Sequence, residues 1–222
     1  MSDLQLLVAH LVKLGLVALL AGMLLRGRLG LCWAFGAYVL AILVGNTLVT
    51  LAPERFYTPA FWVLKQGVYD ALKVAIAIEL AWRAFAAFPG AWRTARVVLL
   101  ALLAVSTLSL AGLTPRAYDT LWQWQPGAVT ASVWLLTTTA LLVVFYQVPI
   151  AEWQRAIMLG LAPYLLVFVT LMSLLRRLGW AMVERISFID QLAYLGLVLF
   201  WAFAAWRKDE TRLAAGPAGS PA

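Results

Sequence analysis

An otherwise apolar stretch, residues 60–86, carries an unusual number of side chains that could do chemistry. The charged and polar residues in it are Lys65, Gln66, Tyr69, Asp70, Lys73, Glu79 and Arg83. At about 100° per residue, all of them fall within about half the circumference of one α-helix. Their spacing also predicts two local ion pairs, Asp70 with Lys73 at i,i+3 and Glu79 with Arg83 at i,i+4. We therefore expect a central helix whose charged half faces its neighbours and whose apolar half, which includes Val63, Val74, Ala77 and Trp82, faces lipid.

These charges predict a binding site because ionisable groups at membrane depth are costly and usually face a partner or a water-filled cavity. An ammonium at Lys73 needs a carboxylate, backbone carbonyls, water or a bound anion. We expect Lys13 and Lys73 to supply positive charge to a small polar or anionic ligand, with Asp70 and Asp190 as counter-ions or proton carriers. Tyr69, Gln66 and Asn46 would shape this site, whereas Glu79 and Arg83 are expected to form a structural ion pair. The alternative is that the charges only fix helix packing.

The composition indicates what surrounds this segment. Of the 222 residues, 64% are hydrophobic and 12% are charged, whereas soluble globular proteins have roughly 45–50% apolar and about 25% charged residues. Such a chain has too few charges to cover a surface that faces water, and it is too apolar for a disordered protein. The sequence therefore predicts a polytopic membrane protein whose main partner is the lipid bilayer.

Seven stretches reach the roughly 20 residues that a helix needs to cross a bilayer core. They run near 4–25, 31–52, 60–86, 97–113, 128–149, 156–176 and 187–206. These lengths predict an all-α integral membrane protein, a seven-transmembrane-helix bundle formed by one domain, residues 1–212. A disordered tail rich in small residues, 213–222, would follow it. The connection 116–125 is expected to form a short interfacial helix that ends at Pro126-Gly127, and the stretch 176–187 could be similar.

The basic residues between these stretches predict an orientation. Eight lie on one side (Arg26, Arg28, Arg93, Arg96, Arg155, Arg207, Lys208 and Arg212) and five on the other (Arg55, Arg116, Arg176, Arg177 and Arg185). The positive-inside rule then places the N-terminus outside and the C-terminus in the cytoplasm of a cell membrane. The Ala-, Leu- and Arg-rich usage fits a bacterial inner membrane. The net charge of +7 is thus interpreted as membrane anchoring, and no nucleic-acid partner is expected.

A weak internal similarity suggests a duplicated architecture. Gln66 and Tyr69 are followed 125 residues later by Gln191 and Tyr194, and Tyr38 is followed 126 residues later by Tyr164. Two three-helix units joined by one linking helix, a 3+1+3 arrangement, would give this spacing. With an odd linker the two units have the same orientation, as in parallel-repeat transporters. The alternative is a chance match between helices rich in leucine and alanine.

The chain lacks the residues that most catalytic sites need. His10 is its one histidine and Cys32 its one cysteine, which excludes an intrachain bis-histidine haem and most histidine-based metal sites. No catalytic residue, metal or cofactor is therefore expected, and translocation of a small polar or anionic solute is the leading hypothesis. The rivals are a sensor that signals through a cytoplasmic partner and a non-catalytic accessory subunit of a larger membrane complex. Assembly with another membrane protein or into a homo-oligomer is open in each case.

Overall fold

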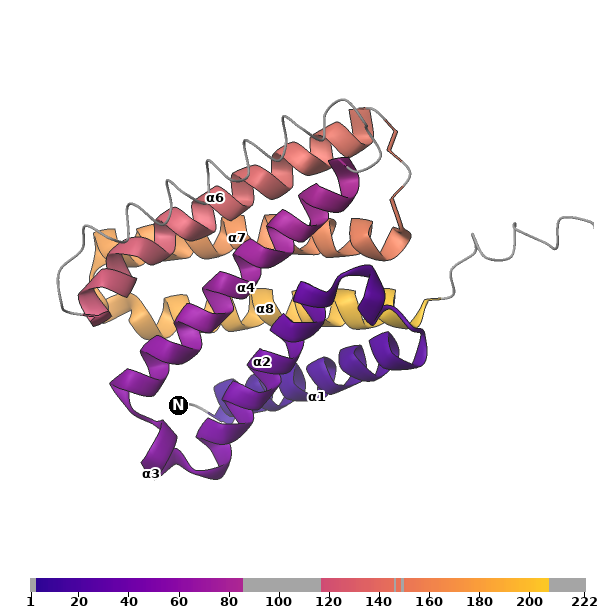
Figure 1. Ribbon diagram of the computed structural model, residues 1–222. Coiled ribbons are helices and arrows are strands. Elements are labelled where there is room, and N and C mark those ends of the chain that lie inside the picture. The colour runs from indigo at the N-terminus through magenta and orange to yellow at the C-terminus, as the bar shows by residue number, and fades with distance from the viewer. Residues whose placement is uncertain (1–2, 86–116, 146, 149, 208–222) are drawn as a thin grey trace, which may run out of the picture.

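The computed structural model describes residues 3–85, 117–145, 147–148 and 150–207. Helices and short connections account for this part of the chain, with no strand in the described ranges (Figure 1). The predicted span 97–113 and the predicted tail 213–222 lie outside the described residues. The elements are α1 (Asp3–Leu25), η1 (Leu29–Leu31), α2 (Trp33–Leu51), α3 (Pro53–Phe56), α4 (Pro59–Phe85), α6 (Ala117–Phe145), α7 (Glu152–Leu178), η2 (Trp180–Met182) and α8 (Val183–Trp206).

Four of the described helices, α1, α2, α7 and α8, are long and apolar enough to cross a membrane. This confirms the expected helical fold with membrane-capable helices. Helix α4 carries five charged residues, and the apolar part of α6 is shorter, Val129–Phe145. Large apolar side chains such as Leu14, Leu199 and Phe203 are more than half exposed. Contact with hydrocarbon explains this exposure, because a lipid-facing surface needs no polar cover.

The long described helices pack as a closed ring. Helix α1 packs against α8, α8 against α7, α7 against α6, α6 against α4, α4 against α2, and α2 against α1 (Figure 1). If α1, α2 and α4 exchange places with α6, α7 and α8, every one of these neighbour relations is preserved. We call these two sets the first and second three-helix units.

Small residues and aromatic rings hold the ring of helices together. A Cβ atom at Gly15 of α1 would lie only 2.6 Å from Cγ1 of Val198 in α8, so the glycine allows the two helices to approach closely. In the core, the ring of Phe35 from α2 lies edge-on to those of Trp201 (4.7 Å between centroids) and Trp153 (5.6 Å). These contacts connect α2 to both α7 and α8.

Arg28, in the connection between α1 and α2, is buried and caps α8. Its guanidinium donates hydrogen bonds to the backbone carbonyls of Ala204 and Arg207, both at 2.6 Å, and lies 5.5 Å from the ring centre of Trp153. The last carbonyls of a helix lack helical partners and carry partial negative charge. Arg28 therefore stabilises the C-terminus of α8 and joins the ends of α1 and α8.

Two predicted connections have a different structure. Instead of a separate interfacial helix over 116–125, α6 runs without a break from Ala117 through Pro126 and Gly127 to Phe145. Proline and glycine are tolerated inside membrane helices because neighbouring groups can satisfy the backbone. The stretch 176–187 is also not a surface helix: α7 continues to Leu178, and the turn η2 leads directly into α8.

Candidate functional site

A buried ion pair on α4 lies at the centre of the described bundle. Lys73 Nζ donates to Asp70 Oδ1 at 2.8 Å, and Lys73 and Asp70 are only 5% and 9% exposed. The Gln66 amide donates to the same carboxylate at 3.3 Å, and the Lys73 ammonium lies 5.1 Å from the ring centre of Phe168 on α7. The positive charge of Lys73 is thus neutralised by a carboxylate on the same helix.

The packing of α4 explains why these charges are buried. Because α4 lies between α2 and α6, only a narrow strip of it is exposed, with Leu64, Val68 and Trp82 between 42% and 64% exposed. Ala77 was expected on the lipid-facing side, but it is 1% exposed. That expectation was wrong because α2 and α6 together cover more of the circumference of α4 than its polar half.

Four tyrosines, one from each of four helices, surround the ion pair. The rings of Tyr38 (α2) and Tyr69 (α4) lie 6.5 Å apart, and those of Tyr164 (α7) and Tyr194 (α8) lie 5.4 Å apart. The hydroxyls of Tyr38 and Tyr194 interact across the two units, and the Tyr69 hydroxyl donates to the carbonyl of Ala41 at 3.4 Å. The pairs Tyr38–Tyr69 and Tyr164–Tyr194 occupy corresponding positions in the two units.

Helix α8 adds a second carboxylate, Asp190, and two further polar side chains, Gln191 and Tyr194. The Tyr164 hydroxyl donates to Asp190 Oδ1 at 3.5 Å, and Asp190 lies within electrostatic range of Lys73. The Gln191 Oε1 and Tyr194 hydroxyl oxygens are buried and form no hydrogen bond of standard geometry with the described residues. A buried polar atom without such a bond is rare in proteins, so the Gln191 oxygen can still accept a hydrogen bond. We call Gln66, Asp70, Lys73, Asp190, Gln191 and the four tyrosines the polar centre.

Two of the expected site residues lie apart from this centre. Lys13 Nζ donates to the Thr50 hydroxyl at 2.6 Å, so this ammonium bridges α1 and α2. The half-buried Asn46 accepts the Thr50 hydroxyl at its backbone carbonyl, 2.8 Å away, and its side chain makes no hydrogen bond within the described ranges. The structure therefore brings together Gln66, Tyr69, Asp70, Lys73 and Asp190, but not Lys13 or Asn46.

Glu79 and Arg83 form an ion pair of 2.7 Å at the other end of α4. The Glu79 carboxylate also accepts the backbone N–H groups of Trp33 (3.2 Å) and Ala34 (2.9 Å). It thereby satisfies two donors at the start of α2, where negative charge is favourable. A hollow of about 770 Å³ lies beside this cap, lined by Trp33, Ala75, Ile78, Glu79, Trp82, Arg83 and Gln154.

Cys32 lies in the connection before α2, beside this cap. Its thiol donates to Glu79 Oε2 at 3.5 Å. Burial, and then the charge of Glu79, raise the pKa of the Cys32 thiol to about 12. Since the thiolate is the reactive form, this cysteine is a structural residue.

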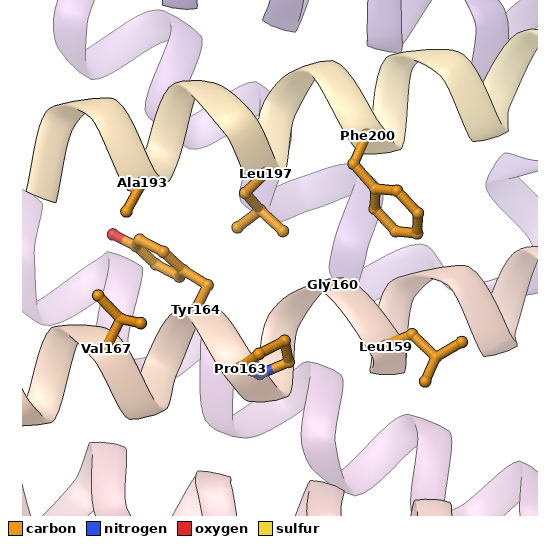
Figure 2. Close-up of a pocket in the computed structure, with 8 residues that line it drawn as sticks. All are labelled: Leu159, Gly160, Pro163, Tyr164, Val167, Ala193, Leu197 and Phe200. Atoms are coloured by element: carbon orange, nitrogen blue, oxygen red, sulfur yellow. The ribbon is translucent and has the colours of Figure 1, made fainter.

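A second hollow, about 310 Å³, opens between α7 and α8 at mid-length and is mainly apolar. Figure 2 shows its lining: Leu159, Gly160, Pro163, Tyr164 and Val167 from α7, and Ala193, Leu197 and Phe200 from α8. Tyr164 lies between the two helices, so it belongs both to this α7–α8 groove and to the polar centre.

Three of the four tyrosines are the main part of the centre that the sequence analysis did not assign to a site. Tyr69 was expected at the site, whereas Tyr38, Tyr164 and Tyr194 were not among the expected ligand-binding residues. The signal that connects the four is their offset, 126 residues from Tyr38 to Tyr164 and 125 from Tyr69 to Tyr194. Within the described residues, no group of three or more His, Cys, Asp or Glu side chains could hold a metal ion. Comparison of the chain with protein-family models, curated proteins and solved structures gives no significant match.

Proposed function

We propose that this protein carries a small polar solute across a cell membrane, through the polar centre between its two three-helix units. The observation that carries this proposal is the buried ion pair of α4 beside tyrosine pairs that occupy corresponding positions in the two units. In repeat-built transporters, the substrate site lies near the midplane at the interface between the repeats. Tyr164 lies near the middle of α7 and Lys73 near the middle of α4, which fits such a site.

The charges of the centre favour a neutral or cationic solute over an anionic one. The described centre has two carboxylates, Asp70 and Asp190, and the ammonium of Lys73, while the Lys65 ammonium lies at its edge, 6.0 Å from the ring centre of Tyr69. The Lys73 ammonium is already paired at 2.8 Å, so an incoming anion would have to displace Asp70. The Gln191 Oε1 atom, which has no hydrogen bond of standard geometry, accepts hydrogen bonds and cannot donate them. Both features suit a solute that donates hydrogen bonds.

The proposal includes seven crossings and a 3+1+3 parallel repeat. Arg28 follows α1 and binds the end of α8, so α1 and α8 run in the same direction. The hairpin connections then make α4 and α6 parallel as well, as the colour gradient in Figure 1 shows. The end of α4 and the start of α6 therefore lie at opposite ends of the bundle. Residues 86–116 join those ends, which supports an additional crossing.

We further propose that the N-terminus lies outside and the C-terminus in the cytoplasm, in a bacterial inner membrane. The excess of basic residues near the ends of α1 and α8 supports this orientation. Fusion of reporters to the C-terminus tests it: a reporter that works only in the cytoplasm should be active. Activity of a reporter that works only outside the cytoplasm would contradict it.

Osmotic swelling of proteoliposomes tests translocation without a labelled solute. Vesicles placed in glycerol, xylitol or urea shrink and then swell again as the solute enters, which light scattering follows. We expect faster swelling than in protein-free vesicles for at least one of these solutes. Tyr194→Phe removes the hydroxyl that interacts with Tyr38 inside the polar centre but keeps the ring, so it should slow solute entry while the protein stays folded. Tyr57→Phe, at a side chain that is 83% exposed, is the matched control.

Two outcomes would overturn the proposal. In the first, none of the three solutes enters the proteoliposomes faster than it enters protein-free vesicles. In the second, Tyr194→Phe and Tyr57→Phe transport at the wild-type rate, which would exclude the polar centre from the path.

A further inference from the structure

The α7–α8 groove opens at the apolar outer surface of the bundle. Both of its walls are helices that can cross a membrane, and the groove lies near the middle of each. Leu159 and Phe200 on its rims are 58% and 42% exposed. Between these two rims the groove is lined by the small residues Gly160 and Ala193, which leave space in it (Figure 2). A hydrocarbon chain therefore fits this groove, because a bilayer offers no water to fill an apolar hollow at this depth.

Polar acceptors make this groove different from an ordinary gap between membrane helices. Tyr164 lines the groove and donates to Asp190 at 3.5 Å, a length at which a hydrogen bond is weak. Pro163 has no backbone N–H, so the Leu159 carbonyl lacks the helical hydrogen bond that position 163 would otherwise donate. The Leu159 carbonyl thus lies in the lining of the apolar groove without its helical donor. The Asp190 carboxylate lies next to that lining, 3.5 Å from the Tyr164 hydroxyl.

We propose that the α7–α8 groove binds a single-chain amphiphile from the bilayer, with a head group that donates a hydrogen bond, an alcohol or an amine. The head group binds at Asp190 beside Tyr164, and the chain lies along Ala193, Leu197 and Phe200. Asp190 and Phe200 are ten residues apart, about 15 Å along the helix axis. A carboxylate or phosphate head group is excluded by repulsion from Asp190. This site lies on the lipid side of the polar centre and does not depend on the proposed transport.

Photolabelling of the full-length protein in liposomes tests this inference. The probes are hexadecanol with a mid-chain diazirine, and hexadecane and hexadecanoic acid with the same diazirine. After irradiation, proteolysis and mass spectrometry locate the adducts. We expect hexadecanol to label residues 159–167 and 193–200 about threefold to tenfold more than hexadecane does, the gain that one hydrogen bond in a membrane gives. Hexadecanoic acid should show no such preference.

Four variants separate the groove from the head-group contact. Ala193→Phe fills the groove and should reduce its labelling at least fivefold, whereas Leu199→Phe, at an exposed position on the same helix, should not. Asp190→Leu should abolish the preference for hexadecanol over hexadecane. Tyr164→Phe frees Asp190 from its present donor while keeping the ring in place, so the preference should rise.

The distribution of adducts distinguishes a specific site in the groove from unspecific lipid contact. Adducts spread evenly over the lipid-facing surface would overturn the site, as would equal labelling of Ala193→Phe and Leu199→Phe. Equal labelling of the groove by hexadecanol and hexadecane would overturn the head-group contact, because only apolar contact would then remain. If Asp190→Leu is poorly folded, an unchanged preference in Tyr164→Phe contradicts the role of Asp190.

Discussion

The buried pair Asp70–Lys73 gives the sharpest test of how charge is accommodated in this bundle. The experiment is a double-mutant cycle with Asp70→Asn, Lys73→Met and the double variant. Each single variant leaves one uncompensated charge at a position that is 9% or 5% exposed. The double variant leaves none. Since each single variant removes the same contact, the cycle isolates the energy of the pair.

The expected magnitude follows from the contact distance. At 2.8 Å and an effective dielectric constant of about 20, the attraction is about 6 kcal/mol before desolvation is subtracted. Loss of one partner of a buried pair typically costs about 3–5 kcal/mol. Gln66 still donates to Asp70, and Phe168 still faces Lys73, so we expect about 3 kcal/mol for each single variant. The double variant should cost no more than either one, which gives a coupling of about 3 kcal/mol.

Equilibrium unfolding in mixed detergent and dodecyl sulfate micelles, followed by tryptophan fluorescence, measures these free energies. The pair Glu79–Arg83 is the internal control. The Arg83 side chain is 34% exposed, and Glu79 keeps the N–H donors of Trp33 and Ala34. Arg83→Met should therefore cost only about 1 kcal/mol. The reasoning is refuted if Lys73→Met costs no more than Arg83→Met, or if the costs of the Asp70 and Lys73 variants simply add.

Three further predictions concern packing and reactivity. The pKa of about 12 at Cys32 predicts that the folded protein resists iodoacetamide at pH 8 and reacts only as the pH approaches 12. The unfolded chain should react at pH 8. Rapid labelling of the folded protein at pH 8 would contradict this prediction. Gly160→Ala places a Cβ atom 2.6 Å from Trp201 Nε1 and should cost about 1–3 kcal/mol in the same unfolding assay, whereas Gly30→Ala meets open space and should cost far less. Arg28→Met removes two hydrogen bonds of 2.6 Å to carbonyls and should cost about 2–3 kcal/mol and raise hydrogen exchange at the end of α8; unchanged exchange there would contradict the capping role.

Local spacing along α4 was enough to predict some of the contacts in the site. Side chains three or four residues apart are neighbours on any helix, so the ion pairs of Asp70 with Lys73 and of Glu79 with Arg83 form within one element. Helix positions also followed from the sequence, because apolar runs of about 20 residues have few alternatives to a membrane helix. The break expected at Pro126-Gly127 failed because local turn signals are weaker evidence in a membrane helix.

Contacts between helices could not be predicted in this way. From the sequence, Lys13 was expected in the binding site, and Arg28 served only to predict the orientation of the chain. In the structure, Lys13 donates to Thr50 instead, and Arg28 is buried against the end of α8.

By itself, then, the sequence determined that the chain forms apolar helices and which charges pair along α4. The tertiary structure decided that tyrosines from four helices surround that pair, and that α7 and α8 leave a groove beside it. The reason is that helical periodicity fixes the angles of side chains within one helix only. The rotation and register of neighbouring helices depend on long-range packing, such as Gly15 against Val198, that no local pattern contains.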